Sequence, residues 1–146
     1  MTDVLLADAF PLACPLRVRW AEVDAQGVVF NGHYLSYADL CCTEYFRAAG
    51  LPLWSGPNPE AEALDAYVVR ATLDYQAPAR FDDLLTLRGR VARLGRSSFT
   101  FGCRIEREGA LLCRAELIYV NARAGASQAL PDAFRAAVLA YQGAAP

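Results

Sequence analysis

The chain contains no lysine, because all 14 of its basic residues are arginine. Lysine forms Schiff bases with carbonyl substrates and contacts phosphates in P-loops, so both kinds of site are excluded. Arginine remains available for phosphate binding through its planar fork of N–H donors. A compositional bias of the genome is the simpler explanation for the missing lysine.

Metal-binding motifs are missing as well. The five cysteines (Cys14, Cys41, Cys42, Cys103 and Cys113) include no C-x-x-C pair. Their odd number, with no signal peptide before them, predicts a reduced, cytoplasmic location. Cys41 and Cys42 are neighbours in a predicted helix, so they point to different faces and make a poor metal pair. We expect buried thiols, and neither a metal nor an organic cofactor.

Long apolar runs and an excess of basic charge are also absent. A net charge of −2 argues against nucleic-acid binding. The apolar stretches are too short for a membrane span, so we expect no membrane insertion. With 146 residues, 55% of them hydrophobic, the chain is predicted to form a single domain over 1–146. This apolar content is high for the size, which favours burial between subunits in a homodimer or homotetramer.

Hydrophobic periodicity divides the chain into strands and helices. After an irregular leader (1–14), Leu16, Val18 and Trp20 alternate as one buried face of a strand. Apolar residues then recur at three- and four-residue steps from 32 to 49, which predicts a helix that Gly50 ends.

Alternation returns in the second half of the chain. Four strands are predicted, at about 67–76, 83–94, 97–107 and 110–121, followed by a short helix that opens at Pro131. The short separators at 95–96 and 108–109 favour antiparallel hairpins in a meander. Together these elements predict an α+β fold in which a sheet covers the long helix.

The segment between the first strand and the long helix carries the strongest candidate for catalysis. Asp24 ends the alternating run, Gly27 permits a turn, and Asn31 is placed to cap the helix. A carboxylate and the free N–H groups from Asn31 to Tyr34 are therefore predicted to converge on one carbonyl group. Gly32 would let a substrate approach the backbone closely. The alternative is that Asp24 is only a turn residue or cap.

Other candidates have equally ordinary alternatives. His33 is either a hydrogen-bonding residue of the pocket or a group on the helix surface. Glu44 is a reserve carboxylate, as is Asp39, unless they are solvated or paired with arginine. Arg93, Arg96, Ser97 and Ser98 surround a predicted turn and are candidates for binding phosphates. Trp54, Tyr67 and Val69 would line an acyl pocket or belong to the core.

Several motifs in order resemble one known family. They are Arg17–Phe30 (RVRWAEVDAQGVVF), Tyr34-Leu35, Thr43-Glu44-Tyr45 with Arg47, Asp74-Tyr75, Pro78-Ala79-Arg80, Asp82-Asp83, Leu94–Phe99 and Leu130-Pro131. This set, which covers about 16–135, resembles the 4-hydroxybenzoyl-CoA thioesterases and related acyl-CoA thioesterases of the hotdog fold, including the Tol-Pal-associated branch.

The resemblance implies a curved antiparallel sheet of at least five strands around one long central helix, with active sites at a dimer interface. It also implies hydrolysis of an acyl-CoA thioester. Asp24 would be the nucleophile or general base, and a backbone amide near Asn31 would polarise the thioester carbonyl. Tyr34, Glu44, Val69, Arg93, Arg96, Ser97 and Ser98 are assigned to substrate binding.

Two positions depart from the pattern. Many members of the Tol-Pal-associated branch have histidine at the position of Asn31 and an aromatic hydroxyl at that of Trp20. Asn31 cannot titrate, so it cannot shuttle protons. An acyl-ACP thioesterase and a non-catalytic acyl-CoA-binding or regulatory module remain as alternatives. A hotdog hydratase would need a paired Asp and His, and His33 does not fit that motif.

Overall fold

The structure is a computed structural model that describes residues 4–5, 9–52 and 64–143. Its strands are β1 (Val4–Leu5), β2 (Leu12–Arg17), β3 (Ala66–Tyr75), β4 (Leu84–Leu94), β5 (Ser98–Arg107), β6 (Ala110–Arg123) and β7 (Ala126–Ser127). Its helices are α1 (Asn31–Ala48), α2 (Asp132–Gln142) and a short 3-10 helix, η1 (Trp20–Glu22).

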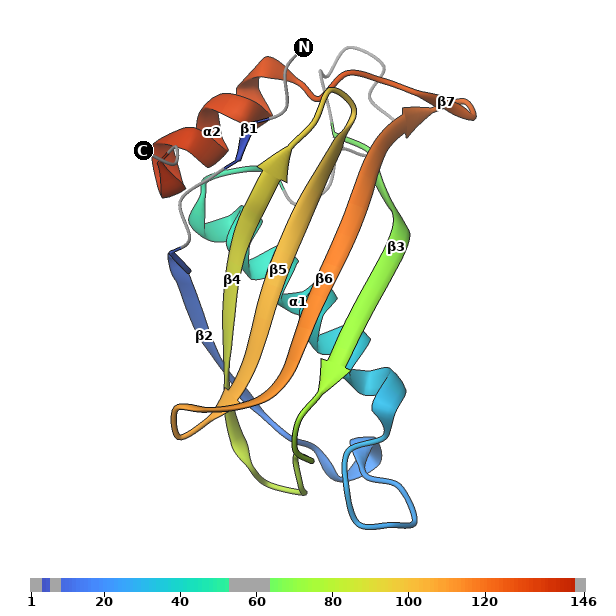
Figure 1. Ribbon diagram of the computed structural model, residues 1–146, viewed down its shortest axis with the longest axis vertical. Coiled ribbons are helices and arrows are strands. Elements are labelled where there is room, and N and C mark those ends of the chain that lie inside the picture. The colour runs from blue at the N-terminus through green and yellow to red at the C-terminus, as the bar shows by residue number, and fades with distance from the viewer. Residues whose placement is uncertain (1–3, 6–8, 53–63, 144–146) are drawn as a thin grey trace.

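The strands form one antiparallel sheet that curves around α1 (Figure 1). Its central order is β4-β5-β6-β3, and both β1 and β2 pair with the outer side of β4. The predicted meander is confirmed for β4, β5 and β6, which consecutive hairpins connect. Although β3 precedes β4 in the chain, it pairs with β6 and so lies at the opposite edge from β2. This arrangement confirms the predicted α+β architecture with at least five strands.

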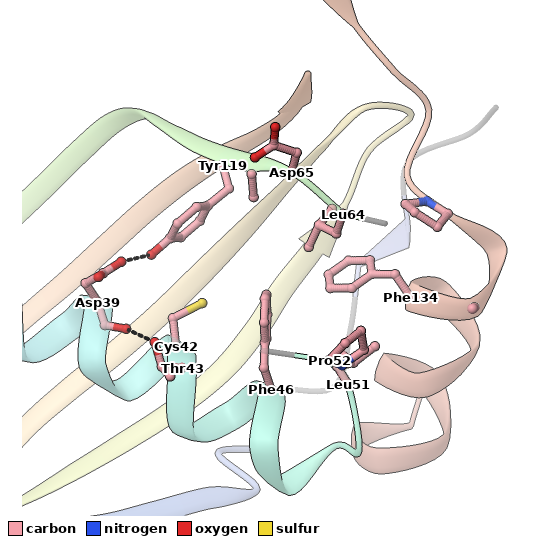
Figure 2. A pocket seen from close by; sticks show the side chains of 13 residues that line it. Asp39, Cys42, Thr43, Phe46, Leu51, Pro52, Leu64, Asp65, Tyr119 and Phe134 are labelled. Atoms are coloured by element: carbon pink, nitrogen blue, oxygen red, sulfur yellow. Dashed lines mark hydrogen bonds between the residues drawn. The ribbon is translucent and has the colours of Figure 1, made fainter. Parts of the chain in front are cut away.

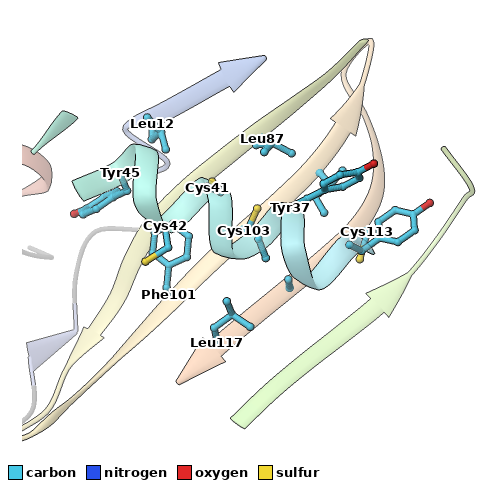
Figure 3. Close-up of a cluster of buried hydrophobic side chains, with 14 of the residues drawn as sticks. Leu12, Tyr37, Cys41, Cys42, Tyr45, Leu87, Phe101, Cys103, Cys113 and Leu117 are labelled. Carbon is cyan, nitrogen blue, oxygen red and sulfur yellow. The ribbon is translucent and has the colours of Figure 1, made fainter. Parts of the chain in front are cut away.

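Alternate residues of the sheet form the core with one side of α1. The buried positions of α1 are Tyr34, Tyr37, Ala38, Cys41, Cys42 and Tyr45. Figure 3 shows several of them beside Leu87, Phe101, Cys103 and Leu117 of the sheet. The long helix is therefore a core element, as its pattern predicted, and Gly50 follows its C-terminal end as expected.

Gly89 of β4 allows α1 to approach the sheet closely. A Cβ atom added at this glycine would lie 2.7 Å from Cys41 Sγ and 2.7 Å from Phe101 Cζ. Both distances are well below van der Waals contact. The missing side chain is thus what lets the middle of α1 pack against β4.

The prediction for the first strand was wrong in two respects. The segment predicted as an irregular leader (1–14) contains β1 and the first half of β2, because Leu12–Arg17 pairs with β4. The strand ends before Trp20, which lies in η1 and is 73% exposed instead of buried. Its ring contacts Phe81 edge to face, with centroids 5.1 Å apart.

None of the helices in the part of the chain that the structure describes is both long enough and apolar enough to cross a membrane.

Candidate active site

Asp24 lies in a small hairpin just before α1. Its N–H donates to the carbonyl of Val28 (2.9 Å), and its own carbonyl accepts from the N–H of Gly27 (3.0 Å). Its side chain is half-buried, and Oδ1 accepts a hydrogen bond from the N–H of Gln26 (2.8 Å). Among the described residues, Oδ2 has no hydrogen-bond partner. Asp24 is therefore a turn residue whose second carboxylate oxygen is still available.

Hydrogen bonds hold this hairpin against the start of α1. The N–H of Phe30 donates to the carbonyl of Glu22, and the N–H of Val29 donates to the carbonyl of Ala79; both N···O distances are 2.9 Å. Glu22 is only 5% exposed, and its carboxylate accepts from the N–H and Nη2 of Arg19, both at 2.8 Å. Burial alone would raise the pKa of Glu22, but these bonds to Arg19 outweigh it and lower the pKa. The segment that carries Asp24 is thus fixed beside the first turn of the helix.

The first turn of α1 has unpaired backbone donors. Asn31 was predicted to cap the helix, but the N-cap is Phe30, and among the described residues no side chain makes a capping hydrogen bond to the N–H groups of this end. The N–H of His33 donates to the carbonyl of Phe30 (3.0 Å), whereas those of Asn31 and Gly32 have no acceptor among the described residues. These N–H groups lie at the positive end of the helix dipole. They can stabilise a negatively charged oxygen.

Two tyrosines fix the surroundings of this helix start. The hydroxyl of Tyr75, at the end of β3, donates to the carbonyl of Asn31 over 3.0 Å. Tyr34 is only 3% exposed, and its hydroxyl accepts from the N–H of Ala79 over 2.9 Å. Burial raises the pKa of Tyr34. Tyr34 is thus a core residue that positions the 76–83 loop, and its predicted contact with substrate stays a prediction.

Gly32 and His33 both lie close to the Phe30 ring. Gly32 is exposed, and an added Cβ would lie 3.0 Å from a carbon of that ring. The half-buried His33 packs edge to face on the same ring, with centroids 5.9 Å apart. Phe30 is 52% exposed, so the ring forms an apolar surface beside the free amides.

The predicted phosphate-binding residues lie at the far end of the sheet. Arg93, Arg96, Ser97 and Ser98 surround the β4–β5 turn. The carbonyl of Ser97 accepts from Asn121, which pairs with Ala66 at the start of β3. Tyr75, beside Asn31, is at the other end of that strand, about 30 Å away at the usual rise per residue. A single chain does not bring these residues to Asp24.

Among the other predicted residues, those that the structure describes also lie away from Asp24. Glu44 forms an ion pair with Arg47 on α1, about 20 Å along the helix from Asn31. Val69 is 61% exposed at an irregular position of β3. Tyr67 is 55% exposed, and Trp54 falls outside the described residues.

A cavity of about 270 Å³ lies between the second half of α1, the start of β3 and α2 (Figure 2). Its lining includes Asp39, Cys42, Phe46, Leu64, Tyr119 and Phe134. Tyr119 donates its hydroxyl hydrogen to Asp39 Oδ1 (2.9 Å), and burial raises the pKa of this tyrosine. Burial also raises the pKa of Cys42 to about 12, so its thiol is protonated at neutral pH and is a poor nucleophile.

The sequence alone did not identify this cavity. Its walls come from four segments that are distant in the chain: 39–52, 64–66, Tyr119 and 131–134. Phe134 lies in the terminal helix that was predicted to open at Pro131, but an apolar residue in a helix gives the same pattern whether it meets a core or a cavity. The feature of the sequence that could have indicated the cavity is Asp39, a charged residue in the middle of the predicted helix.

Comparisons with known proteins show the family of this chain. The thioesterase superfamily profile matches residues 26–114. The acyl-CoA thioester hydrolase YbgC of Escherichia coli is 33% identical over 107 residues, which are 73% of this chain and 78% of that protein. The 4-hydroxybenzoyl-CoA thioesterase of Pseudomonas is 26% identical over 83 residues, which are 57% of this chain and 59% of that protein.

The fold has a close structural counterpart. A Thermus thermophilus thioesterase, solved with coenzyme A and zinc, superposes with a TM-score of 0.80 at 26% identity. The match covers 96% of this chain and all of that one (100%), which confirms the predicted hotdog fold. The chain therefore belongs to the thioesterase superfamily and, as predicted, is a thioester hydrolase.

Proposed function

We propose that this protein is an acyl-CoA thioesterase that uses Asp24 and the free amides at the start of α1. The observation that carries the proposal is the hairpin that holds a carboxylate, with one oxygen unbonded within the described residues, beside the unpaired N–H groups of Asn31 and Gly32. The names of the relatives in E. coli and Pseudomonas supply the acyl-CoA substrate class.

Two mechanisms fit this geometry. As a nucleophile, Asp24 adds to the thioester carbon, and the C–S bond breaks to release CoA thiolate and leave a mixed anhydride for water to hydrolyse. As a general base, Asp24 takes a proton from the water that adds to the same carbon, and the thiolate leaves from the tetrahedral intermediate. In both, the N–H groups of Asn31 and Gly32 stabilise the oxyanion. His33 and the Phe30 ring would border the thioester.

Release of free thiol from a panel of acyl-CoAs tests the proposal. We expect the wild type to cleave members of the panel faster than the matching acyl groups on acyl-carrier protein. Faster cleavage of the carrier-protein thioesters would identify an acyl-ACP thioesterase. Saturable binding of acyl-CoAs without cleavage would favour a binding or regulatory module. We also propose that the enzyme consists of one domain and is cytoplasmic.

The outer edge of β3 supports a homodimer. Within the described residues β3 pairs only with β6, and its exposed apolar side chains include Tyr67, Val68 and Val69, which are 55%, 45% and 61% exposed. An apolar strand edge of this kind normally pairs or is covered. A two-fold axis perpendicular to the sheet would join two copies of β3 antiparallel. That pairing would continue the sheet across the two subunits.

Such a dimer would complete the active site. Antiparallel pairing places the start of β3 in one subunit beside the end of β3 in the other. Tyr75 at the end of β3 bonds to Asn31, so the end of β3 marks the end of the subunit that carries Asp24. The partner's Asp24 would therefore lie beside Ala66, at the start of β3, and beside the cavity of this subunit. The β4–β5 turn with Arg96 is at the same end as Ala66, so it would reach the CoA phosphates. Residues about 30 Å apart in one chain would thus meet across the interface.

Val69→Lys should weaken the dimer, because a charged side chain at a strand edge opposes edge-to-edge pairing. We expect sedimentation velocity to show monomers at concentrations where the wild type is dimeric, with activity at least about tenfold lower. Ala140→Lys adds the same charge at an exposed position of α2, outside β3, and as the control it should remain dimeric. A monomeric variant with full activity would disprove the shared active site.

The cavity is the best candidate for the acyl group. A CH₂ group is close in size to a water molecule, which occupies about 30 Å³. The 270 Å³ of the cavity therefore holds about nine such groups, which corresponds to an acyl chain of medium length or to a single aromatic ring. Ala133 of α2 lines the cavity but is exposed, so a larger side chain there can narrow the cavity without disturbing the core.

We expect Ala133→Phe to lower kcat/KM for octanoyl-CoA about tenfold and for acetyl-CoA less than twofold. The measurement is thiol release across acyl chain lengths. Ala136→Phe, at another exposed position of α2, should leave the chain-length profile unchanged. Equal losses for all chain lengths would place the acyl group elsewhere.

A further inference from the structure

A second hollow, of about 590 Å³, lies on the face of the sheet opposite α1. Side chains alternate along β4 and β5: Leu87 and Ile105 point into the core, whereas Arg88 and Arg104 point to the opposite face. We call this hollow, lined by Phe10, Arg88, Gly102, Arg104, Arg114 and Glu116, the arginine recess. It is built from β4, β5 and β6 and is separate from the hairpin of Asp24.

Three arginines of the recess form a row across adjacent strands. Arg88 pairs in register with Arg104, and Arg104 pairs with Arg114. Like charges directly opposite each other destabilise a sheet unless a counter-charge compensates them. The row therefore needs negative charge nearby.

Glu106 compensates part of the row. It is only 6% exposed, and its two carboxylate oxygens accept hydrogen bonds from Arg88 Nε and Arg104 Nε, each at a distance of 2.9 Å. Burial would raise the pKa of Glu106, but the two arginines lower it, so the carboxylate stays charged. This bridge fixes both guanidinium groups while each retains further N–H donors.

Arg114 lies in register opposite Asp74 of β3, but the two form no ion pair within the described residues. Arg114 is exposed, and the next cross-strand row places Gly102 between Arg90 and Glu116, so that no side chain projects from the middle strand of that row. On the other side of the recess, the Arg104 guanidinium lies 5.9 Å from the centre of the Phe10 ring. The row therefore sets three arginines against two carboxylates, Glu106 and Asp74, beside a hollow large enough for a ligand.

We propose that the arginine recess binds a diphosphate, either free or as part of a nucleotide. Guanidinium groups bind phosphate oxygens through paired, charge-assisted hydrogen bonds. Neighbouring strands are about 4.8 Å apart, so Arg88, Arg104 and Arg114 can surround two linked phosphates.

Isothermal titration of the full-length protein with pyrophosphate in low-salt buffer tests this site. We expect saturable binding by the wild type and at least a tenfold weaker Kd for Arg114→Gln. Arg123→Gln removes an equally exposed arginine of β6 outside the recess and should bind like the wild type. Titration with ADP identifies the source: tighter binding than pyrophosphate indicates a nucleotide, and weaker binding a free diphosphate.

Two results would overturn the proposal. One is absence of binding by the wild type, or equal weakening in Arg114→Gln and Arg123→Gln, which would indicate only a diffuse effect of charge. The other is loss of a larger oligomer in Arg114→Gln, seen by sedimentation velocity, with no response of the wild type to pyrophosphate. The row would then be a contact between subunits.

Discussion

Asp24→Asn is expected to lower kcat for acyl-CoA hydrolysis by about a hundredfold or more, with a small effect on KM. An amide can neither attack the thioester carbon nor accept a proton from water. Loss of a general base typically lowers the rate on the order of 10²- to 10⁴-fold. Asparagine keeps the side-chain oxygen that accepts from Gln26, so the hairpin should fold normally. Steady-state thiol release gives both constants.

Glu108→Gln is the matched control for this variant. It makes the same carboxylate-to-amide change at an exposed turn between β5 and β6, outside the proposed site. We expect wild-type kcat and KM. Full activity in Asp24→Asn would mean that another carboxylate acts, and Asp39, which faces the cavity, would be tested next by the same substitution.

Local patterns predicted the elements of this fold well. The long helix was expected at 32–49 and spans Asn31–Ala48, because its apolar spacing and Gly50 are signals within one segment. The β4–β5 and β5–β6 hairpins were predicted for the same reason, since each has a short turn. The hairpin of Asp24 beside the helix start also depends on neighbours in sequence.

Features that depend on distant segments were not predictable from these patterns. Trp20 continues the alternation of the first strand, yet the chain leaves the sheet after Arg17. The spacing of apolar residues within β3 and within β6 does not indicate that these two strands pair with each other. The separation between Asp24 and the Arg96 turn follows from that pairing. A pattern within one segment cannot place two segments relative to each other.

Gly89→Ala is expected to destabilise the protein by about 1–3 kcal/mol, the usual cost of overpacking a core. The added Cβ would lie 2.7 Å from Cys41 Sγ and from Phe101 Cζ, so both α1 and β5 must move. Alanine also restricts the unfolded chain, which by itself would stabilise by about 0.4–1 kcal/mol, but a clash with two buried side chains outweighs that gain. Urea unfolding at one fixed protein concentration measures the difference, since a dimer's stability depends on concentration.

Gly102→Ala separates this clash from a general effect of alanine in a strand. Its added Cβ would lie 3.7 Å from Arg90 Cγ, an ordinary contact, so we expect stability unchanged or raised by up to about 1 kcal/mol. Combining Gly89→Ala with Cys41→Ala removes one of the two clashing atoms. The double variant should then be more stable than the sum of the single effects predicts, by about 1 kcal/mol. Strict additivity would mean that α1 does not approach β4 as closely as Gly89 permits.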